Sequence, residues 1–311
     1  MDYFSRQRSI PDWHQPLMEV QTTLVLGVGG IGCSVARNLC RLGVQEVIIV
    51  DCDTVSASNV NRQVLYSTSD VGRSKVSAAL DGLKPHCIRT KLTGVEFDAV
   101  KEWGKIVELT KRSNVVFNGI DVGEYFDYAV TSLCVTLGVS YVAASSYGHT
   151  AVVDCYPPPL LPRDGPCWAC NNSPNDRDIF SQLTPIHITQ ISSLSFLPKD
   201  THMPATQDVG SSVLVATLAA TLATGSWVNS LHGYQLPHWT TCDFTTLSMT
   251  SFHVERSLSC LICNQAPRYS PTVLDVYFGL EKVPLSRVPG RTLTISPADS
   301  QAAVESEVVL K

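Results

Sequence analysis

The chain has 311 residues, of which 44% are hydrophobic and only 16% are charged, against about 25% charged in an ordinary globular protein. Such a chain can bury a sizeable core, so the composition excludes disorder of the whole chain. The net charge of −5 gives no basic excess for a polyphosphate-binding face, so a nucleic-acid partner is disfavoured.

The first 150 residues alternate short apolar strands with helices. The pattern predicts a strand at 22–27, a glycine turn, a helix ending at Leu42 before Gly43, and a strand at 46–50. Further elements are predicted as a helix at 75–83, a strand at 114–119, a helix at 124–137 and a strand at 140–144. Because βαβ units build parallel sheets, we predict an α/β fold with a doubly wound, mostly parallel, Rossmann-like sheet.

Beyond Thr150 this alternation breaks, and residues 157–208 are rich in Pro, Asn, Asp and Ser. An apolar helix near 210–224 and two strand-like runs around 240–252 follow. The uncharged stretch 209–228 carries several hydroxyls, so we predict a buried helix there and no membrane span. The predicted units are an N-terminal arm at 1–20, a nucleotide-binding core at 21–156, a crossover loop with helix and strands at 157–265, and an unassigned tail at 266–311.

The eleven cysteines divide into two C-x-x-C pairs and seven scattered residues. The N-terminus shows no apolar signal segment, and an odd number of cysteines does not suit a disulfide framework. We therefore expect a reducing, cytoplasmic location.

The segment Gly27-Val28-Gly29-Gly30-Ile31-Gly32 joins the first strand to the first helix. Gly27, Gly29 and Gly32 fit the G-x-G-x-x-G pattern, in which a sharp turn lets a phosphate approach the positive end of a helix. Asp51 ends the second strand about 20 residues later, where an acid accepts ribose hydroxyls. The pattern predicts nucleotide binding; the alternative is a glycine-rich corner with a solvated aspartate.

Three charged residues downstream distinguish ATP from a dinucleotide. A triphosphate needs cations near its β- and γ-phosphates. Arg62 offers a planar guanidinium with paired N–H donors, and Lys75 offers a compact positive charge. A divalent ion beside phosphates needs a carboxylate, and Asp121 follows a strand at the edge where such folds bind ligands.

These residues belong to longer motifs: V-L-G-V-G-G-I-G at 25–32, V-D-x-D-T-V at 50–55, S-N-V-N-R-Q at 58–63, G-x-S-K at 72–75 and S-R-Q at 5–7. Together with the paired C-x-x-C, they resemble the ubiquitin-activating-enzyme-like ThiF/MoeB/HesA family over residues 3–265. The resemblance implies adenylation, with ATP and Mg²⁺, of the C-terminal carboxylate of a ubiquitin-fold or sulfur-carrier protein ending in Gly-Gly, or of a peptide.

Carried over position by position, the resemblance implies a nucleotide site and four catalytic residues. Its nucleotide-binding residues would be Gly27, Gly29, Gly30, Gly32, Asp51, Asp53, Ser58, Asn59, Arg62, Gln63, Lys75, Asp121 and Val122. Asp121 would hold magnesium, Arg62 and Lys75 would offset charge on the departing pyrophosphate, and Asn59 would orient a phosphate or the water bound to the metal. Arg6 would reach the active site of a neighbouring subunit, which implies a homodimer or a heterodimer with a related chain; the alternative is an ordinary solvated arginine.

The chain departs from the family after its third strand. Val122 stands where the family has Asn, and Phe126 where we expect Arg, which implies an unusual substrate or weakened activity; alternatively, Phe126 is simply a core residue of its helix. The crossover segment 199–208 has no cysteine that could form a thioester. Cys242 is a weak candidate for this nucleophile, and we expect the other cysteines outside the C-x-x-C pairs to be buried. We therefore expect adenylation without covalent transfer, as in the MoeB-like branch.

The pairs Cys167/Cys170 and Cys260/Cys263 can close a Cys₄ zinc site that ties the loop after the sheet to the C-terminal segment. A closed set of four thiolates has no open position, so its role would be structural. Four unmetallated thiols are one alternative. A redox C-x-x-C is another, although Cys167 and Cys170 lack the βαβ context of such motifs.

Several other functions stay open at this point. The chain could be a tRNA- or peptide-modifying relative of the same fold, or a non-catalytic partner that lends a dimer surface. The losses at Val122 and Phe126 favour the non-catalytic partner, whereas the retained Arg62, Lys75 and Asp121 oppose it. A dehydrogenase would prefer NAD to ATP.

Overall fold

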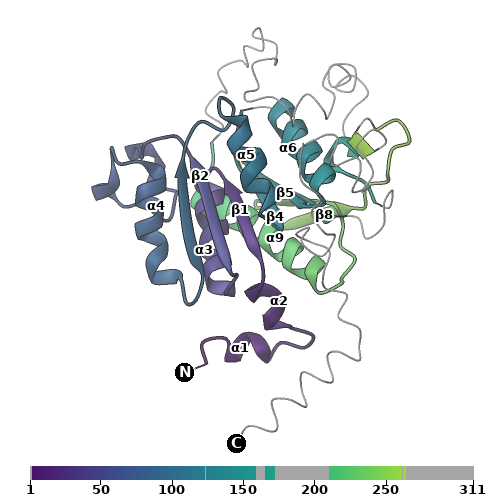
Figure 1. The fold of residues 1–311 in the computed structure, drawn as a ribbon, viewed down its shortest axis with the longest axis horizontal. Helices are drawn as coiled ribbons and strands as arrows, with labels where there is room; N and C mark the ends of the chain where they lie inside the picture. The colour runs from purple at the N-terminus through teal and green to yellow at the C-terminus, as the bar shows by residue number, and fades with distance from the viewer. Residues whose placement is uncertain (1, 123, 159–164, 172–209, 261, 264–311) are drawn as a thin grey trace, which may run out of the picture.

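We describe a computed structural model of the chain, which covers residues 2–122, 124–158, 165–171, 210–260 and 262–263 (Figure 1). Within these ranges, eight strands form one sheet in the order β3-β2-β1-β4-β5-β6-β7-β8. The strands are β1 Thr22–Leu26, β2 Glu46–Asp51, β3 Lys91–Glu96, β4 Val115–Asn118, β5 Ser140–Tyr147, β6 Thr150–Tyr156, β7 Trp239–Asp243 and β8 Ser248–Phe252.

The helices of the described residues alternate with the strands as far as β5. The α-helices are α1 Ser5–Arg8, α2 Gln15–Glu19, α3 Gly30–Leu42, α4 Lys75–Leu83, α5 Trp103–Lys111, α6 Glu124–Leu137 and α9 Val213–Leu231. Short 3-10 helices are η1 Ala57–Asn59, η2 Thr68–Asp70, η3 Lys84–His86 and η4 Trp168–Asn171.

The predicted α/β fold is confirmed. The pairs β1–β2, β2–β3, β1–β4 and β4–β5 are parallel, and β6, β7 and β8 add antiparallel strands to the same sheet. The sequence pattern missed β3, α5 and β6. In β3 no residue is fully buried, and along most of β6 buried residues alternate with half-buried ones. Neither strand therefore shows the continuous apolar run that is typical of a central strand.

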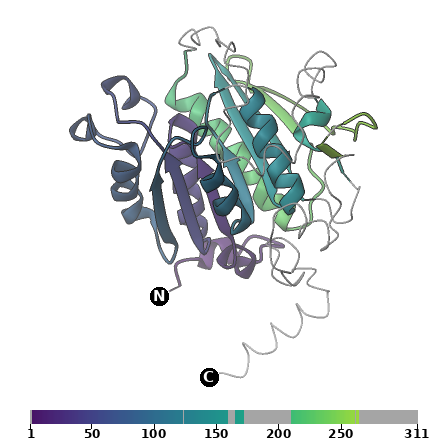
Figure 2. The same ribbon diagram turned by 45° about the horizontal axis from the view of Figure 1, so that its top comes forward.

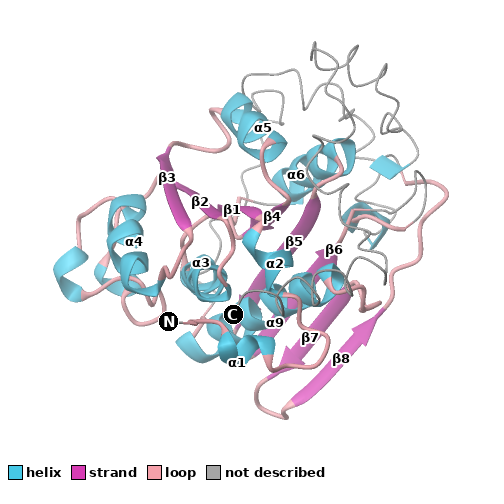
Figure 3. Cartoon of the chain, turned by 60° about the horizontal axis from the view of Figure 1, so that its bottom comes forward, coloured by secondary structure: helices cyan, strands magenta, loops and turns pink. Residues whose placement is uncertain are grey.

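Helices cover both faces of the sheet (Figures 2 and 3), and each face has its own core. On one face α3, α4 and α9 pack over Val25, Ile49 and Phe117. On the other face α5 and α6 pack over Leu24 and Val116. Successive residues of a strand point to opposite faces of the sheet, and consecutive residues of β1 and β2 are apolar. The central strands are therefore buried on both sides.

Helix α9 lies across the sheet, where it contacts α3, β5 and β6. It is long and apolar enough to cross a membrane by length and composition, and it is the one such helix in the described part of the chain. Its buried residues include Val215, Ala219, Ala223 and Trp227, which join the cores of the sheet. The predicted buried helix is therefore present, and it extends beyond residue 224 to Leu231.

The N-terminal arm lies at the end of the sheet where β1 begins (Figure 1). Phe4 is 1% exposed, and its ring packs against Gly43, the residue that ends α3. Gln15 Nε2 donates to the carbonyl of Leu42 at 3.0 Å. The arm is therefore two short helices anchored to the core.

The carboxyl group of Asp154 in β6 is half-buried and forms no ion pair within the described residues. Its Oδ1 accepts a hydrogen bond from Tyr156 Oη at 3.3 Å. Burial, together with the nearby Asp127 carboxylate, raises the pKa of Asp154 from its ordinary 3.8 to about 7. The folded protein therefore keeps this proton at pH values where the unfolded chain has lost it.

We predict that Asp154 lowers stability as the pH rises from about 4 to about 7, with a slope of at most about 1.4 kcal/mol per pH unit. Asp154→Asn, which does not titrate, should remove this contribution. Urea unfolding of both proteins at several pH values measures the difference. Two stability curves that stay parallel between pH 4 and 7 would contradict the assignment.

Candidate functional site

The turn between β1 and α3 requires glycine at two positions. Gly27 has a φ of +83°, and a Cβ there would lie 2.9 Å from the carbonyl oxygen of Gly119. A Cβ on Gly32 would overlap the carbonyl oxygen of Gly27. The chain can therefore fold tightly over the ends of β1 and β4, and the first N–H groups of α3 are directed to the carboxyl edge of the sheet.

Asp51, at the end of β2, holds this turn in place. Its Oδ2 accepts the backbone N–H of Val28 at 2.9 Å, and its Oδ1 accepts that of Asp53 at 2.9 Å. Tyr66 adds a second tie, because its hydroxyl donates to the carbonyl of Val28 at 2.8 Å. The sequence predicted Asp51 as a ribose ligand; its structural bond to Val28 and the role of Tyr66 were missed, and no motif indicated them.

Two predicted cations flank the turn. The Cγ and Cδ atoms of Arg62 lie 3.5 and 3.7 Å from the point where a Cβ of Gly30 would be, and its Nη1 donates to the carbonyl of Ser58 at 2.8 Å. Lys75 begins α4 and is 8% exposed, with its Nζ 2.7 Å from Asp53 Oδ2. Arg62 thus lies over the start of α3, and Lys75 is held by an acid of the neighbouring loop.

Gln63 presents a buried polar atom without a partner. The residue is 4% exposed, and its Oε1 has no hydrogen-bond partner among the described residues. Its Nε2 lies 4.0 Å from the position of a Cβ on Gly29. A buried amide oxygen without a hydrogen-bond partner is costly. This side chain is therefore suited to accept a hydrogen bond from a ligand bound at the turn.

Ser58 and Asn59 lie on η1, next to Arg62. Asn59 Oδ1 accepts the backbone N–H of Ser56 at 2.9 Å, and the hydroxyls of Ser56 and Ser58 are 3.0 Å apart. Both side chains therefore help to shape the loop that carries Arg62. The structure brings this loop, the glycine turn and Asp51 to one edge of the sheet.

Asp121 and Val122 follow β4 and are both exposed. The N–H of Gly119 bonds to the carbonyl of Leu26 at 2.8 Å, so this turn lies directly beside the glycine turn. The strand order reverses between β1 and β4, and the crevice at such a reversal is where open α/β sheets bind ligands. Asp121 is thus placed on one side of the predicted nucleotide site and Asp51 on the other.

Phe126, at the position where the sequence analysis expected Arg, is 1% exposed and contacts Trp103 of α5 edge to face, with ring centroids 6.0 Å apart. It belongs to the core that α6 buries, so the alternative of a simple core residue is correct. No cation from this position reaches the site.

Arg6 is exposed on α1, at the opposite edge of the sheet from the glycine turn of its own chain. The arm packs against the end of α3, whereas the turn lies at its start, and a helix of 13 residues is about 20 Å long. The predicted nucleotide residues are therefore gathered at one edge, and Arg6 is not among them.

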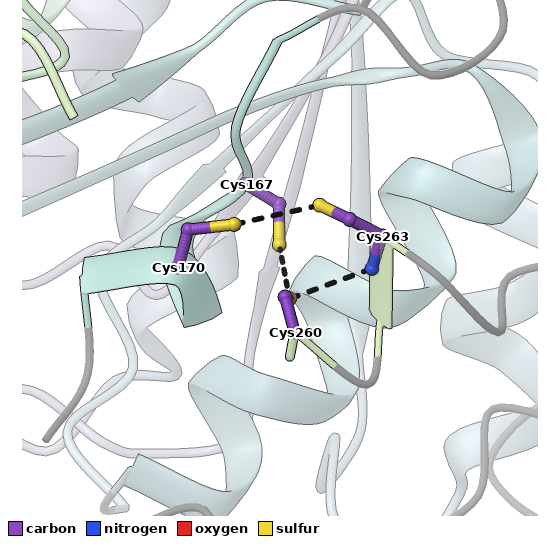
Figure 4. A group of neighbouring side chains, drawn as sticks. All are labelled: Cys167, Cys170, Cys260 and Cys263. Carbon is purple, nitrogen blue, oxygen red and sulfur yellow. Dashed lines mark hydrogen bonds between the residues drawn. The ribbon is translucent and has the colours of Figure 1, made fainter. Parts of the chain in front are cut away.

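The four C-x-x-C thiols form one cluster on the α6 face of the sheet (Figure 4). The sulfurs of Cys167 and Cys260 lie 3.6 Å apart, as do those of Cys170 and Cys263, and all four lie within 4.8 Å of one another. A tetrahedral zinc ion with Zn–S bonds of about 2.3 Å separates its sulfurs by about 3.8 Å. The cluster therefore fits zinc.

The four thiols also affect one another's ionisation. Burial raises the pKa of Cys167 well above its ordinary value, whereas hydrogen bonds, first of all from Cys167, hold that of Cys170 below it. Four thiolates cannot share so small a space without a cation, and a divalent ion would supply the charge.

The sequence pattern indicated that the other cysteines are buried, and this is wrong for the exposed Cys52 and for Cys87, which is half-buried. Cys52 is exposed between Asp51 and Asp53, and Cys242 in β7 is half-buried. Partial burial and the neighbouring Asp53 carboxylate raise the pKa of Cys52, so its thiol is not activated as a nucleophile. The crossover segment 199–208, which lacks a cysteine, lies outside the described residues, as does the tail 266–311.

These features together match one family. The profile of the ThiF family covers residues 4–262. The chain belongs to the ThiF family. It is 31% identical over 182 residues to the adenylyltransferase and sulfurtransferase uba4 of Emericella nidulans, covering 54% of this chain and 36% of that one. It is 28% identical over 168 residues to the SUMO-activating enzyme subunit uba-2 of Caenorhabditis elegans, covering 53% and 28%.

The chain thus spans about a third of the length of these ThiF-related proteins. Among solved structures, MccB of E. coli with ATP superposes with a TM-score of 0.64 at 19% identity, covering 85% of this chain and 74% of that one. This likeness shows a shared fold.

For the cysteine cluster we predict about one zinc ion per chain in freshly purified protein, and a lower melting temperature after chelation. Because the cluster lies on the α6 face and the nucleotide residues lie at the strand ends, chelation should not first remove ATP affinity. Metal analysis and thermal melts of the wild type and of Cys260→Ser measure both effects. Well under one zinc per chain would refute the assignment.

Proposed function

We propose that this chain is an ATP-dependent adenylyltransferase that activates the C-terminal carboxylate of a ubiquitin-like or sulfur-carrier protein, or of a peptide. One observation supports it above the others: the glycine turn, Arg62, Lys75 and the unsatisfied Gln63 meet at the switch point of the sheet. Membership of the ThiF family and the names of the sequence relatives support the same activity.

The N-terminus of α3 and the two cations suit a triphosphate. The unpaired N–H groups and the helix dipole favour negative charge at the turn, and Arg62 and Lys75 add two positive charges beside it. Lys75 is ion-paired with Asp53 at 2.7 Å, so its ammonium is held in place before a ligand arrives. A dinucleotide would need only the first of these features.

In the proposed reaction, a carboxylate oxygen of the substrate attacks the α-phosphorus of ATP in line. The new O–P bond forms as the bond to the bridging oxygen breaks, and pyrophosphate leaves with the electron pair. The residues of this chain supply position and charge: Arg62 and Lys75 neutralise the departing pyrophosphate, and Asn59 orients a phosphate. No nucleophilic side chain is needed for this step.

Asp121 would hold Mg²⁺, because its carboxylate is exposed at the carboxyl edge of β4 and oxygen ligands suit this ion. Bound there, the ion would neutralise phosphate charge. Val122 offers no polar side chain beside Asp121, so the ion would find no side-chain ligand at that position.

A non-catalytic partner subunit is the second candidate, and the burial of Phe126 favours it, because the cation expected at this position is missing. ATP binding separates the two functions. A partner subunit without activity need not bind ATP·Mg²⁺, whereas the adenylyltransferase must.

We predict that pyrophosphate exchange into ATP requires a carboxyl-terminal substrate and falls roughly 100-fold or more in Asp121→Ala, because a charge-stabilising group is lost. The assay uses a sulfur-carrier protein ending in Gly-Gly and, separately, its C-terminal peptide. Glu108→Ala removes an exposed carboxylate of α5 and serves as the matched control. Exchange that survives Asp121→Ala would overturn the assignment.

For Arg6 we predict action on the site of a second subunit in a homodimer. Arg6→Ala should lower turnover by about 1000-fold, as for arginine fingers in phosphoryl transfer, with little change in nucleotide affinity. The exposed Arg89 gives a matched control, Arg89→Ala.

Mixing Arg6→Ala chains with Asp121→Ala chains should restore activity, because a hybrid dimer contains one site with both residues intact. Exchange of subunits is verified by native mass spectrometry of the mixture. No recovery in an exchanged mixture would mean that Arg6 does not act across the dimer.

A further inference from the structure

A buried polar network lies directly behind the turn that carries Asp121. Asn118, the last residue of β4, donates from Nδ2 to Asp127 Oδ1 on α6 at 2.6 Å. The hydroxyl of Tyr141 in β5 donates to the same oxygen at 3.1 Å. Three elements that are separate in sequence thus meet at one carboxylate oxygen.

The network continues into the turn itself. Asn118 Oδ1 accepts the backbone N–H of Ile120 at 3.4 Å, so the amide of Asn118 links Asp127 to the residue before Asp121. Asn118 is 5% exposed and Tyr141 is 1% exposed. Because a buried amide is costly when unsatisfied, Asn118 has one stable orientation, and that orientation fixes the turn.

The core of α6 sets the position of Asp127. Its neighbour Phe126 is buried against Trp103 of α5, with ring centroids 6.0 Å apart, so this turn of the helix is anchored in the core between α5 and α6. A residue directly after Phe126 on the helix can then reach the end of β4. The aromatic core contact therefore brings the carboxylate into reach of Asn118.

We propose that Asp127, acting through Asn118 and assisted by Tyr141, is a positioning residue that holds the turn 119–121 and thereby Asp121. The proposal rests on the proposed function, in which Asp121 binds Mg²⁺. Asp127 itself touches neither nucleotide nor metal in this account. Its hydrogen bond to Asn118 is charge-assisted, and bonds of this kind are among the stronger ones in proteins.

The first test uses the protein without metal or nucleotide. Amide hydrogen exchange of peptides spanning 118–122 reports the bond of the Ile120 N–H. In Asp127→Ala this exchange should speed up roughly tenfold or more, since a hydrogen bond to a charged group is lost. Val130→Ala, which removes buried methyl groups from the same helix outside the network, controls for general loosening of α6.

The second test measures the Mg²⁺ concentration that gives half-maximal pyrophosphate exchange. Asp127→Ala should raise it roughly tenfold or more, whereas Tyr141→Phe, which keeps the bond between Asn118 and Asp127, should raise it less. The Val130→Ala control should leave it unchanged. Equal Mg²⁺ requirements in Asp127→Ala and the wild type would overturn the proposal.

A reciprocal exchange of side chains provides the sharpest test. Asn118→Asp alone places a second carboxylate against Asp127 and should be the most impaired variant. Adding Asp127→Asn restores a donor and an acceptor between the two positions, so the double variant should recover most of the Mg²⁺ affinity and slow amide exchange. A double variant no better than Asn118→Asp would contradict the proposal.

Failure of this proposal differs from failure of the proposed function. If the wild type catalyses no pyrophosphate exchange and binds no ATP·Mg²⁺, the adenylyltransferase assignment fails, while the amide-exchange test of the turn still decides whether Asp127 holds it. If the wild type is active and the variants behave like the Val130→Ala control, only the role of Asp127 fails.

Discussion

The absence of a side chain at Gly27 and Gly32 is the constraint on which the site depends. Gly27 lies against the carbonyl of Gly119 and Gly32 against that of Gly27, so no other residue fits without moving the backbone. Only this close fold directs the start of α3 to the ends of β1 and β4. The tie between Asp51 and the Val28 N–H then fixes the turn from the side of β2.

Around this turn, charge and hydrogen bonding are arranged in advance of a ligand. Lys75 is held by Asp53, and Arg62 lies over Gly30. Gln63, whose Nε2 lies near Gly29, keeps a buried oxygen that has no partner in the described part of the chain. On the opposite side, Asn118 and Asp127 restrain the turn of Asp121. Groups that are already oriented lose little freedom when a ligand binds, which is the physical basis of stabilising a reacting phosphate.

The molecule also separates two tasks between the ends of the sheet. The carboxyl edge gathers the proposed nucleotide residues, whereas the amino edge carries the arm, anchored by Phe4 and Gln15. Arg6 is consequently removed from the site of its own chain by about the length of α3, roughly 20 Å for its 13 residues. The cysteine cluster lies apart from both, packed on the α6 face, where a zinc ion would join Cys167 to Cys260.

The sequence by itself determined the central parallel strands, the glycine turn and the two C-x-x-C pairs, because each rests on local residue types and fixed spacing. It did not reveal β3 or β6, whose faces are only partly apolar, nor the exposure of Cys52. The sequence also did not predict the hydrogen bonds among Asn118, Asp127 and Tyr141, because only the packing of α6 and β5 against β4 brings these residues together. Tertiary structure likewise decided that Phe126 is a core residue and that Arg6 lies at the far edge, because burial and distance depend on contacts between segments remote in sequence.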